Sequence, residues 1–165
     1  MGASLVLIGP PAAGKTRIGK RVAKELGVPF VDTDARIVAA HGEIRRIFEE
    51  HGEEHFRALE RAEVERALAE DAVVAFGGGA VLDERTQRDL ADVPVVLLTV
   101  SSDAVAARIG GDSRPLLAQG GIDAWRELYE RRRPIYERLA DLTVDTSARP
   151  MQTLAKEIAQ WLRTR

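Results

Sequence analysis

Residues 9–16 read Gly-Pro-Pro-Ala-Ala-Gly-Lys-Thr, and this spacing matches the phosphate-loop pattern G-x-x-x-x-G-K-[ST]. The glycines allow backbone N–H groups to turn inward around an anion, and a following helix adds its positive N-terminus. Lys15 would reach the β- and γ-phosphates of a nucleotide, and the Thr16 hydroxyl would hold Mg²⁺. The segment therefore predicts a nucleotide-binding loop formed by Gly9, Pro10, Pro11, Ala12, Ala13, Gly14, Lys15 and Thr16.

Two carboxylates lie close together in the sequence Asp32-Thr33-Asp34. Beside a phosphate loop, one carboxylate can orient a magnesium-bound water, and we assign this role to Asp32. The second carboxylate, that of Asp34, could point to a hydroxyl that loses its proton during phosphoryl transfer. Alternatively, Asp34 caps the helix that follows, as Asp often does. The residues alone leave these two interpretations of Asp34 equally open.

Further candidate residues lie on helices and turns. Arg57 and Glu60 are three residues apart on one helical face, a spacing that is typical of a surface ion pair. The glycine triplet (residues 77–79) follows an apolar run and offers bare backbone to a ligand. Arg114 lies in a glycine-rich stretch with the composition of a mobile lid. Three consecutive arginines at 131–133 are typical of a solvated helix face.

These residues need a scaffold, and the apolar pattern indicates which one. Short apolar runs alternate with longer amphipathic stretches, which predicts an α/β fold with a parallel sheet covered on both faces. Ligands bind beyond the carboxyl ends of the strands of such a sheet, and the motifs above follow three of the runs. Strands are expected at residues 5–8, 29–32, 72–76, 93–100 and 142–144.

The helical pattern starts after the phosphate loop, with Gly27 as its stop. A long charged region over residues 35–70 is expected to be helical and to break near His41-Gly42 and His51-Gly52. Residues 151–163 form the last expected helix, because Leu154, Ile158 and Leu162 give it one apolar face.

The length and composition of the chain exclude several classes of function. The 165 residues fit one domain, and the net charge of −2 argues against broad binding to nucleic acid or to anionic membranes. The absence of cysteine excludes disulfides, zinc–thiolate sites and thiol catalysis. No apolar run approaches the roughly 20 residues of a membrane span. We expect a soluble, cytoplasmic protein, and a small kinase fits this length better than a motor or a switch.

In their order along the chain, GPPAAGKT, DTD, FRALE, FGGGAV, RPLL and RRPIY resemble the motifs of shikimate kinase, a P-loop enzyme family of the nucleoside-monophosphate-kinase fold. The resemblance covers essentially the whole chain. It implies a three-layer α/β/α P-loop kinase with a five-stranded parallel sheet, all within a single kinase domain (1–165). It also implies a helical substrate-binding subdomain over about residues 33–61 and a mobile lid over about residues 110–122.

The implied activity is ATP-dependent phosphorylation of the 3-hydroxyl of shikimate, in the route to chorismate and aromatic amino acids. By resemblance, Asp34 binds the ring hydroxyls and orients or deprotonates the attacking one. Arg57 and Arg132 clamp the shikimate carboxylate, which suits the bidentate geometry of guanidinium. Gly78 and Gly79 contact the substrate through their backbone.

On the nucleotide side, the resemblance implies Mg²⁺ as cofactor with ATP as donor. Thr16 and, through water, Asp32 would serve the metal. Arg114 would be the lid arginine at the phosphates, and Arg108 and Pro150 match the positions that enclose adenine. The implied catalytic residues are Lys15, Asp34 and Arg114.

The chain departs from the family pattern in three places. Val38 stands where an acidic residue is frequent, the connection between Asp34 and Arg57 is one residue shorter, and so is the lid before Arg114. These departures bear on substrate affinity more than on the reaction class. The alternatives are a P-loop kinase for gluconate, a nucleoside monophosphate or another cyclitol acid, and a nucleotide-binding module without catalysis. ATP and shikimate are the expected partners, with no nucleic acid or membrane, and we expect a monomer.

Overall fold

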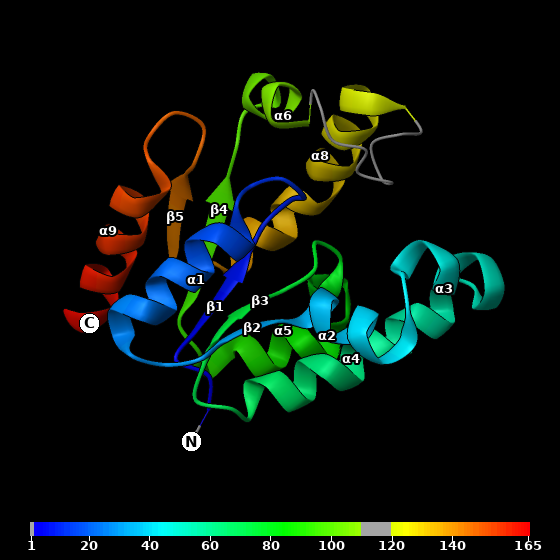
Figure 1. Ribbon diagram of the computed structural model, residues 1–165, viewed down its shortest axis with the longest axis horizontal. Helices are drawn as coiled ribbons and strands as arrows, with labels where there is room; N and C mark the ends of the chain where they lie inside the picture. The colour runs from blue at the N-terminus through cyan, green and yellow to red at the C-terminus, as the bar shows by residue number, and fades with distance from the viewer. Residues whose placement is uncertain (1, 110–119) are drawn as a thin grey trace.

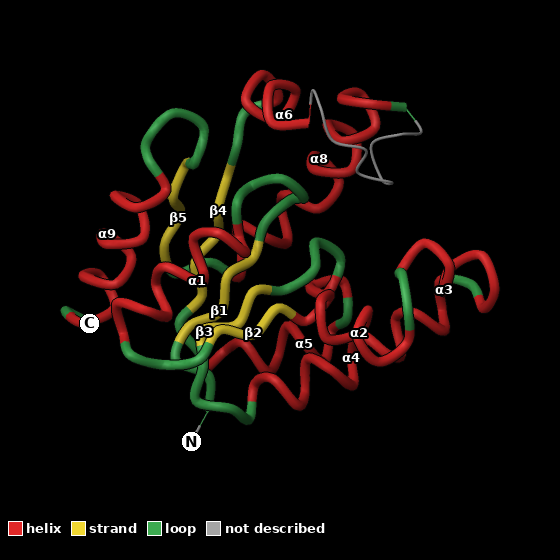
Figure 2. The backbone as a smooth tube through the Cα atoms, in the orientation of Figure 1, coloured by secondary structure: helices red, strands yellow, loops and turns green. Residues whose placement is uncertain are grey.

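The computed structural model describes residues 2–109 and 120–165. Its centre is a five-stranded sheet in the order β2-β3-β1-β4-β5, in which every neighbouring pair of strands is parallel. Helices cover both faces of this sheet (Figures 1 and 2). The prediction of an α/β fold with five parallel strands is confirmed, and the strands are β1 (Leu5–Ile8), β2 (Phe30–Asp32), β3 (Val73–Ala75), β4 (Val95–Thr99) and β5 (Leu142–Asp145).

The sheet separates two clusters of buried apolar side chains. Leu5 and Leu7 point to the face that is covered by α1 and α9, which lie side by side in Figure 1. Val6 and Ile8 point to the opposite face, towards α4 and the second half of α8. Successive residues of a strand alternate between faces, so β1 must be apolar throughout to be covered on both sides.

The helices and 3-10 turns connect the strands in a regular order. Among the helices of the described residues, none combines the length and apolar character of a membrane span. In chain order, the helices and 3-10 turns are α1 (Lys15–Leu26), α2 (Thr33–His41), α3 (Ile44–His51), α4 (Glu53–Leu68), η1 (Ala80–Leu82), α5 (Glu84–Asp89), η2 (Leu90–Asp92), α6 (Ser102–Ile109), α8 (Gly121–Leu139) and α9 (Met151–Arg163).

After β2, the helices α2 and α3 extend beyond the carboxyl end of the strand, and α4 returns beneath the sheet (Figure 1). The predicted breaks between them are confirmed, because Gly42 and Gly52 lie at the helix ends with φ of 90° and 86°. Glycine adopts such positive φ values without steric cost. A small apolar cluster of Ile37, Ile47 and Phe56 holds the three helices together.

The predicted lid falls mainly outside the described residues, because it includes residues 110–119. Gly121 and Ile122, at its predicted end, form the start of α8.

Candidate active site

The phosphate loop (residues 9–16) connects β1 to α1 at the carboxyl edge of the sheet. The Lys15 ammonium group donates to the carbonyl oxygens of Gly9 and Pro10, at 2.5 and 3.0 Å. Gly14 precedes α1 with φ of 96°, and Ala12 has φ of 69°. A left-handed conformation is uncommon for alanine, so the surroundings must hold this loop in shape.

Three distant side chains supply that support, each donating to one carbonyl group of the loop. Trp125 Nε1 donates to Pro11 O at 2.8 Å, and Arg108 Nη1 donates to Ala12 O at 2.8 Å. The Thr146 hydroxyl donates to Ala13 O at 2.7 Å. Side chains from α8, α6 and the end of β5 therefore hold three consecutive peptide groups. Trp125 and Thr146 were not predicted, because no local pattern marks partners more than 110 residues apart in sequence.

Thr16 and Asp32 lie together beside the loop, with the Thr16 hydroxyl 2.8 Å from Asp32 Oδ2. The other oxygen of Asp32 accepts from the N–H of Ala35 at 3.1 Å and so caps α2. The capping alternative for Asp34 is therefore wrong, since the preceding carboxylate takes that position. A hydroxyl and a carboxylate are oxygen ligands of the kind that Mg²⁺ prefers, and this pair fits the metal predicted beside the phosphates.

The acceptor side of the site is built around the glycine triplet, which lies between β3 and η1. A Cβ added at Gly77 would clash with the Asp34 carboxylate, and one added at Gly79 would lie 2.5 Å from Arg57 Nη1. At Gly78 an added Cβ would lie 3.2 Å from Arg132 Nη1. Three predicted substrate-binding side chains therefore meet at three consecutive glycines, and any larger residue would displace them.

Asp34 is a carboxylate with unusual surroundings. Its Oδ1 atom is buried and has no hydrogen-bond partner among the described residues. Burial raises the pKa of Asp34, and the negative charge of Asp32 adds to this effect, whereas Lys15 and Arg57 oppose it. A buried oxygen without a partner is free to accept a proton or a hydrogen bond from a ligand hydroxyl. This geometry suits a group that orients and deprotonates an acceptor.

Arg57 and Glu60 form an ion pair of 2.7 Å, but the prediction of an exposed pair is wrong for one partner. The Glu60 side chain is only 5% exposed, because α4 turns this face towards the site. Burial raises the pKa of Glu60 to about 7, although the pairing with Arg57 acts in the opposite direction. Glu60 therefore pairs with the guanidinium group of Arg57, and the two Nη atoms of Arg57 lie beside Gly79.

The three consecutive arginines of α8 have different surroundings. Arg131 and Arg133 are exposed, and Arg133 pairs with Glu130 and Glu137 on its own helix. Arg132 is half-buried and faces Gly78. The prediction of a solvated face holds for Arg131 and Arg133 and is wrong for Arg132.

Three predicted residues of the nucleotide side have different outcomes. Arg108, besides its bond to Ala12, contacts the backbone oxygen of Thr146, so it lies between the phosphate loop and the segment after β5. Pro150 is exposed at the end of that segment, where α9 begins. Arg114 lies outside the described residues.

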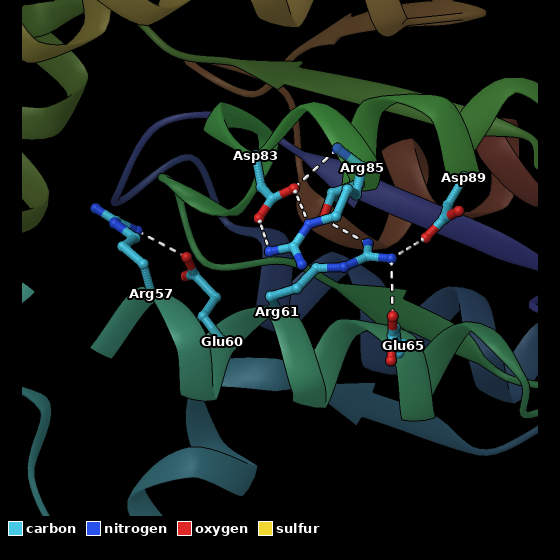
Figure 3. A network of polar contacts seen from close by, with 8 residues as sticks. Arg57, Glu60, Arg61, Glu65, Asp83, Arg85 and Asp89 are labelled. Atoms are coloured by element: carbon cyan, nitrogen blue, oxygen red, sulfur yellow. Dashed lines mark hydrogen bonds and ion pairs between the residues drawn. The ribbon is translucent and has the colours of Figure 1, made fainter. Parts of the chain in front are cut away.

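A polar network that was not predicted fastens α4 to its neighbours (Figure 3). Arg61, with a side chain only 10% exposed, donates to Thr86 Oγ1 at 2.9 Å and pairs with Asp89 at 2.7 Å and Glu65 at 3.0 Å. On the other side, Arg36 of α2 pairs with Glu63 of α4 at 3.5 Å and donates to both carboxylate oxygens of Glu70, just beyond the end of α4. The helix that carries Arg57 is thereby fixed to α5 and to α2.

Comparisons with known proteins identify the family of the chain. A sequence model of the shikimate kinase family matches residues 11–163. The shikimate kinase of Thermobifida fusca is 48% identical over 160 residues, which cover 95% of this chain and 93% of that protein. The relative from Salinispora tropica, also a shikimate kinase, is 47% identical with 95% and 96% coverage.

The solved structures point the same way. A shikimate kinase from Acinetobacter baumannii in complex with shikimate has a TM-score of 0.91 and 32% identity, covering 99% of this chain and 94% of that one. A gluconokinase from Sinorhizobium meliloti has a TM-score of 0.67 but only 21% identity, with 98% and 92% coverage, and this similarity concerns the fold alone. Because the family model matches residues 11–163 and relatives that are 47–48% identical cover 95% of its length, the chain belongs to the shikimate kinase family.

Proposed function

We propose that the protein transfers the γ-phosphoryl group of ATP to the 3-hydroxyl of shikimate, as a step towards chorismate and aromatic amino acids. The hydroxyl oxygen forms a bond to the γ-phosphorus, the bond from that phosphorus to the β–γ bridging oxygen breaks, and ADP leaves. The observation that carries this proposal is the convergence of Asp34, Arg57 and Arg132 on the glycine triplet. Family membership supports the same reaction.

On the acceptor side, two guanidinium groups and one carboxylate match the chemistry of a small hydroxylated acid. Arg57 and Arg132 would bind the shikimate carboxylate, since guanidinium keeps its charge and offers two parallel donors. Asp34 would accept the proton of the attacking hydroxyl, a role for which its raised pKa and its unpartnered oxygen are suited. Gly78 and Gly79 would let the substrate lie directly against the backbone.

On the donor side, the phosphate loop would bind the β- and γ-phosphates, with Lys15 neutralising the charge that develops in transfer. When bound, Mg²⁺ would supply positive charge that offsets the negative charge of the phosphates. Thr16 would ligate it directly, and Asp32 would act on it through water. Arg108 and Pro150 would enclose adenine. For Arg114, the proposed role at the phosphates rests on the sequence.

We also propose a single kinase domain that works as a cytoplasmic monomer, with residues 33–61 as its substrate-binding region and residues 110–122 as its lid. In the part of the chain that the structure describes, only Val38 and Leu82 are large apolar side chains with more than a third of their surface exposed. Two exposed apolar side chains are too few to make an apolar interface of the kind that holds stable oligomers.

A coupled assay of ADP release with shikimate, gluconate and AMP as separate acceptors tests the proposed function. We expect turnover with shikimate and only background with the other two. Lys15→Met is the matched control, because it should reduce turnover at least about a hundredfold while circular dichroism shows an unchanged fold. Turnover with gluconate or AMP but not shikimate would contradict the proposal, and none with any acceptor would favour a non-catalytic nucleotide-binding protein.

A further inference from the structure

Thr33 lies between the two functional carboxylates, yet its own side chain faces the protein interior. It is fully buried, with no exposed surface. Its hydroxyl accepts from the N–H of Gly77 at 3.2 Å and donates to the carbonyl oxygen of Ala75 at 3.4 Å. A side chain at the start of α2 therefore ties that helix to the segment after β3, and it is directly followed by Asp34.

Tyr136 makes a comparable contact from the other side. It is 1% exposed, and its hydroxyl donates to the carbonyl oxygen of Gly78 at 2.6 Å. Burial raises its pKa to about 12, so the hydroxyl remains protonated and able to donate at neutral pH. Tyr136 follows Arg132 by one turn of α8, so this hydrogen bond fixes the helix that carries Arg132 against the glycine triplet.

The triplet needs such anchors because it has no side chains of its own. Glycine backbone is the most flexible in proteins and loses the most entropy on being fixed. Thr33 holds the Gly77 amide and Tyr136 holds the Gly78 carbonyl, two neighbouring groups of this backbone. Each anchor is also coupled through its own helix to a proposed substrate-binding residue, Asp34 in one case and Arg132 in the other.

We propose that the buried hydroxyls of Thr33 and Tyr136 are positioning groups for the acceptor site, holding the glycine triplet at the distance from Asp34, Arg57 and Arg132 that shikimate binding requires. This inference rests on the proposed function, because it concerns the binding of that acceptor. Neither hydroxyl is proposed to touch the substrate. Their effect is transmitted through the backbone of the triplet, through the helices α2 and α8 and, for Tyr136, through its side-chain contact with Arg132.

The test uses variants that remove a hydroxyl with little change of shape. Thr33→Val and Tyr136→Phe should each raise the KM for shikimate about tenfold. The first leaves the buried Gly77 amide without its partner, and the second removes the hydrogen bond of the half-buried Gly78 carbonyl. The KM for ATP should change less than about twofold, because the phosphate loop has separate anchors in Trp125 and Thr146. Thr33→Ser keeps the hydroxyl and should remain within about twofold of the wild type for both substrates.

Hydrogen–deuterium exchange of residues 77–79 in the ligand-free protein provides a readout that is independent of the reaction. Exchange should be faster in Thr33→Val and Tyr136→Phe than in the wild type and in Thr33→Ser. If the wild-type protein itself does not phosphorylate shikimate, the proposed function fails. The exchange data would then still report whether the hydroxyls hold the triplet.

Several results would overturn the inference. These are an unchanged KM for shikimate in both hydroxyl deletions, an equal rise of both KM values, or a Thr33→Ser variant as impaired as Thr33→Val. If Thr33→Val does not fold, Tyr136→Phe decides alone by the same criteria, because it keeps the aromatic ring in the core.

Discussion

At the scale of single residues, the site depends on where each charge lies rather than on how many charges the chain carries. Arg131 and Arg133 are exposed, whereas Arg132 between them faces Gly78. Similarly, Glu53 and Glu60 both pair with Arg57, but only Glu60 is buried. Burial strengthens the electrostatic effect of a charge. Arg132 and Glu60 therefore have a larger effect on the proposed acceptor site than their exposed neighbours.

The first prediction concerns the role of Arg132 at the carboxylate. Arg132→Ala should raise the KM for shikimate about 10- to 100-fold, the range expected for loss of a charge-assisted hydrogen bond. The KM for ATP should stay within about twofold, as steady-state kinetics with each substrate varied in turn would show. Arg133→Ala is the matched control and should leave both values unchanged, because the ion pairs of Arg133 in the described part of the chain are with exposed glutamates of its own helix. An equal effect of Arg132→Ala on both substrates would contradict the carboxylate role.

The second prediction concerns the pH dependence of stability through Glu60. Burial raises its pKa from 4.5 to about 7 in the folded protein, so the folded state binds the proton more tightly than the unfolded state. The stabilising contribution is complete below about pH 4.5 and is lost as the pH rises through 7. Glu60→Gln has no titrating group at this position. Between pH 5 and pH 8 its free energy of unfolding should therefore fall by about 1–3 kcal/mol less than that of the wild type.

Urea denaturation of both proteins across this pH range measures the difference for Glu60. Curves of unfolding free energy against pH that run parallel for the two proteins would show that Glu60 has an ordinary pKa.

At the scale of elements, α4 carries Arg57 and is fixed on both sides. Arg61 connects it to α5 through Thr86 and Asp89, and Glu70 just beyond its end binds Arg36 of α2. Buried or half-buried pairs of this kind fix the orientation of a helix more than they add to stability. The position of Arg57 in the site therefore depends on contacts one turn further along the same helix.

The third prediction is that Arg61→Ala destabilises the fold by about 1–3 kcal/mol, because Thr86 loses a buried donor and two carboxylates lose their partner. Arg45→Ala is the control, since Arg45 forms an exposed pair with Glu49, and should cost less than about 0.5 kcal/mol. The measurement is urea denaturation at one pH. Equal losses in the two variants would mean that the Arg61 network adds nothing beyond a surface ion pair.

Most elements could be predicted from the sequence, because their signals are local. The apolar periodicity of residues 151–163 predicts α9 with its observed bounds, and the breaks at Gly42 and Gly52 are correct. The groups that support the site could not be predicted. Trp125 and Pro11 are 114 residues apart, and Thr33 and Gly77 are 44 apart. Contacts of this kind arise from the tertiary fold and leave no periodic pattern in the sequence.

The roles of Asp32 and Glu60 show the same limit at the level of side chains. The sequence pattern allows either carboxylate of Asp32-Thr33-Asp34 to cap α2, and only the path of the chain shows that it is Asp32. The spacing of Arg57 and Glu60 predicts their pairing correctly. It does not indicate burial, because the neighbours that cover Glu60 come from other parts of the chain.

At the scale of the whole molecule, the strand order explains why the motifs form one site. The strands β2, β3 and β1 are adjacent and parallel, so their carboxyl ends meet at one edge of the sheet. Asp32, the glycine triplet and the phosphate loop follow these three ends directly. The proposed donor and acceptor sites are therefore neighbours as a result of topology, although their motifs are about 20 to 70 residues apart in sequence.

The central claim is that Asp34, Arg57, Arg132 and the glycine triplet form the acceptor site for shikimate. A crystal structure of the protein with shikimate and ADP tests it most directly. We predict that the carboxylate of shikimate lies within hydrogen-bond distance of both guanidinium groups and that a ring hydroxyl lies within hydrogen-bond distance of Asp34. A shikimate carboxylate bound away from Arg57 and Arg132, or a ring without contact to Asp34, would contradict the claim.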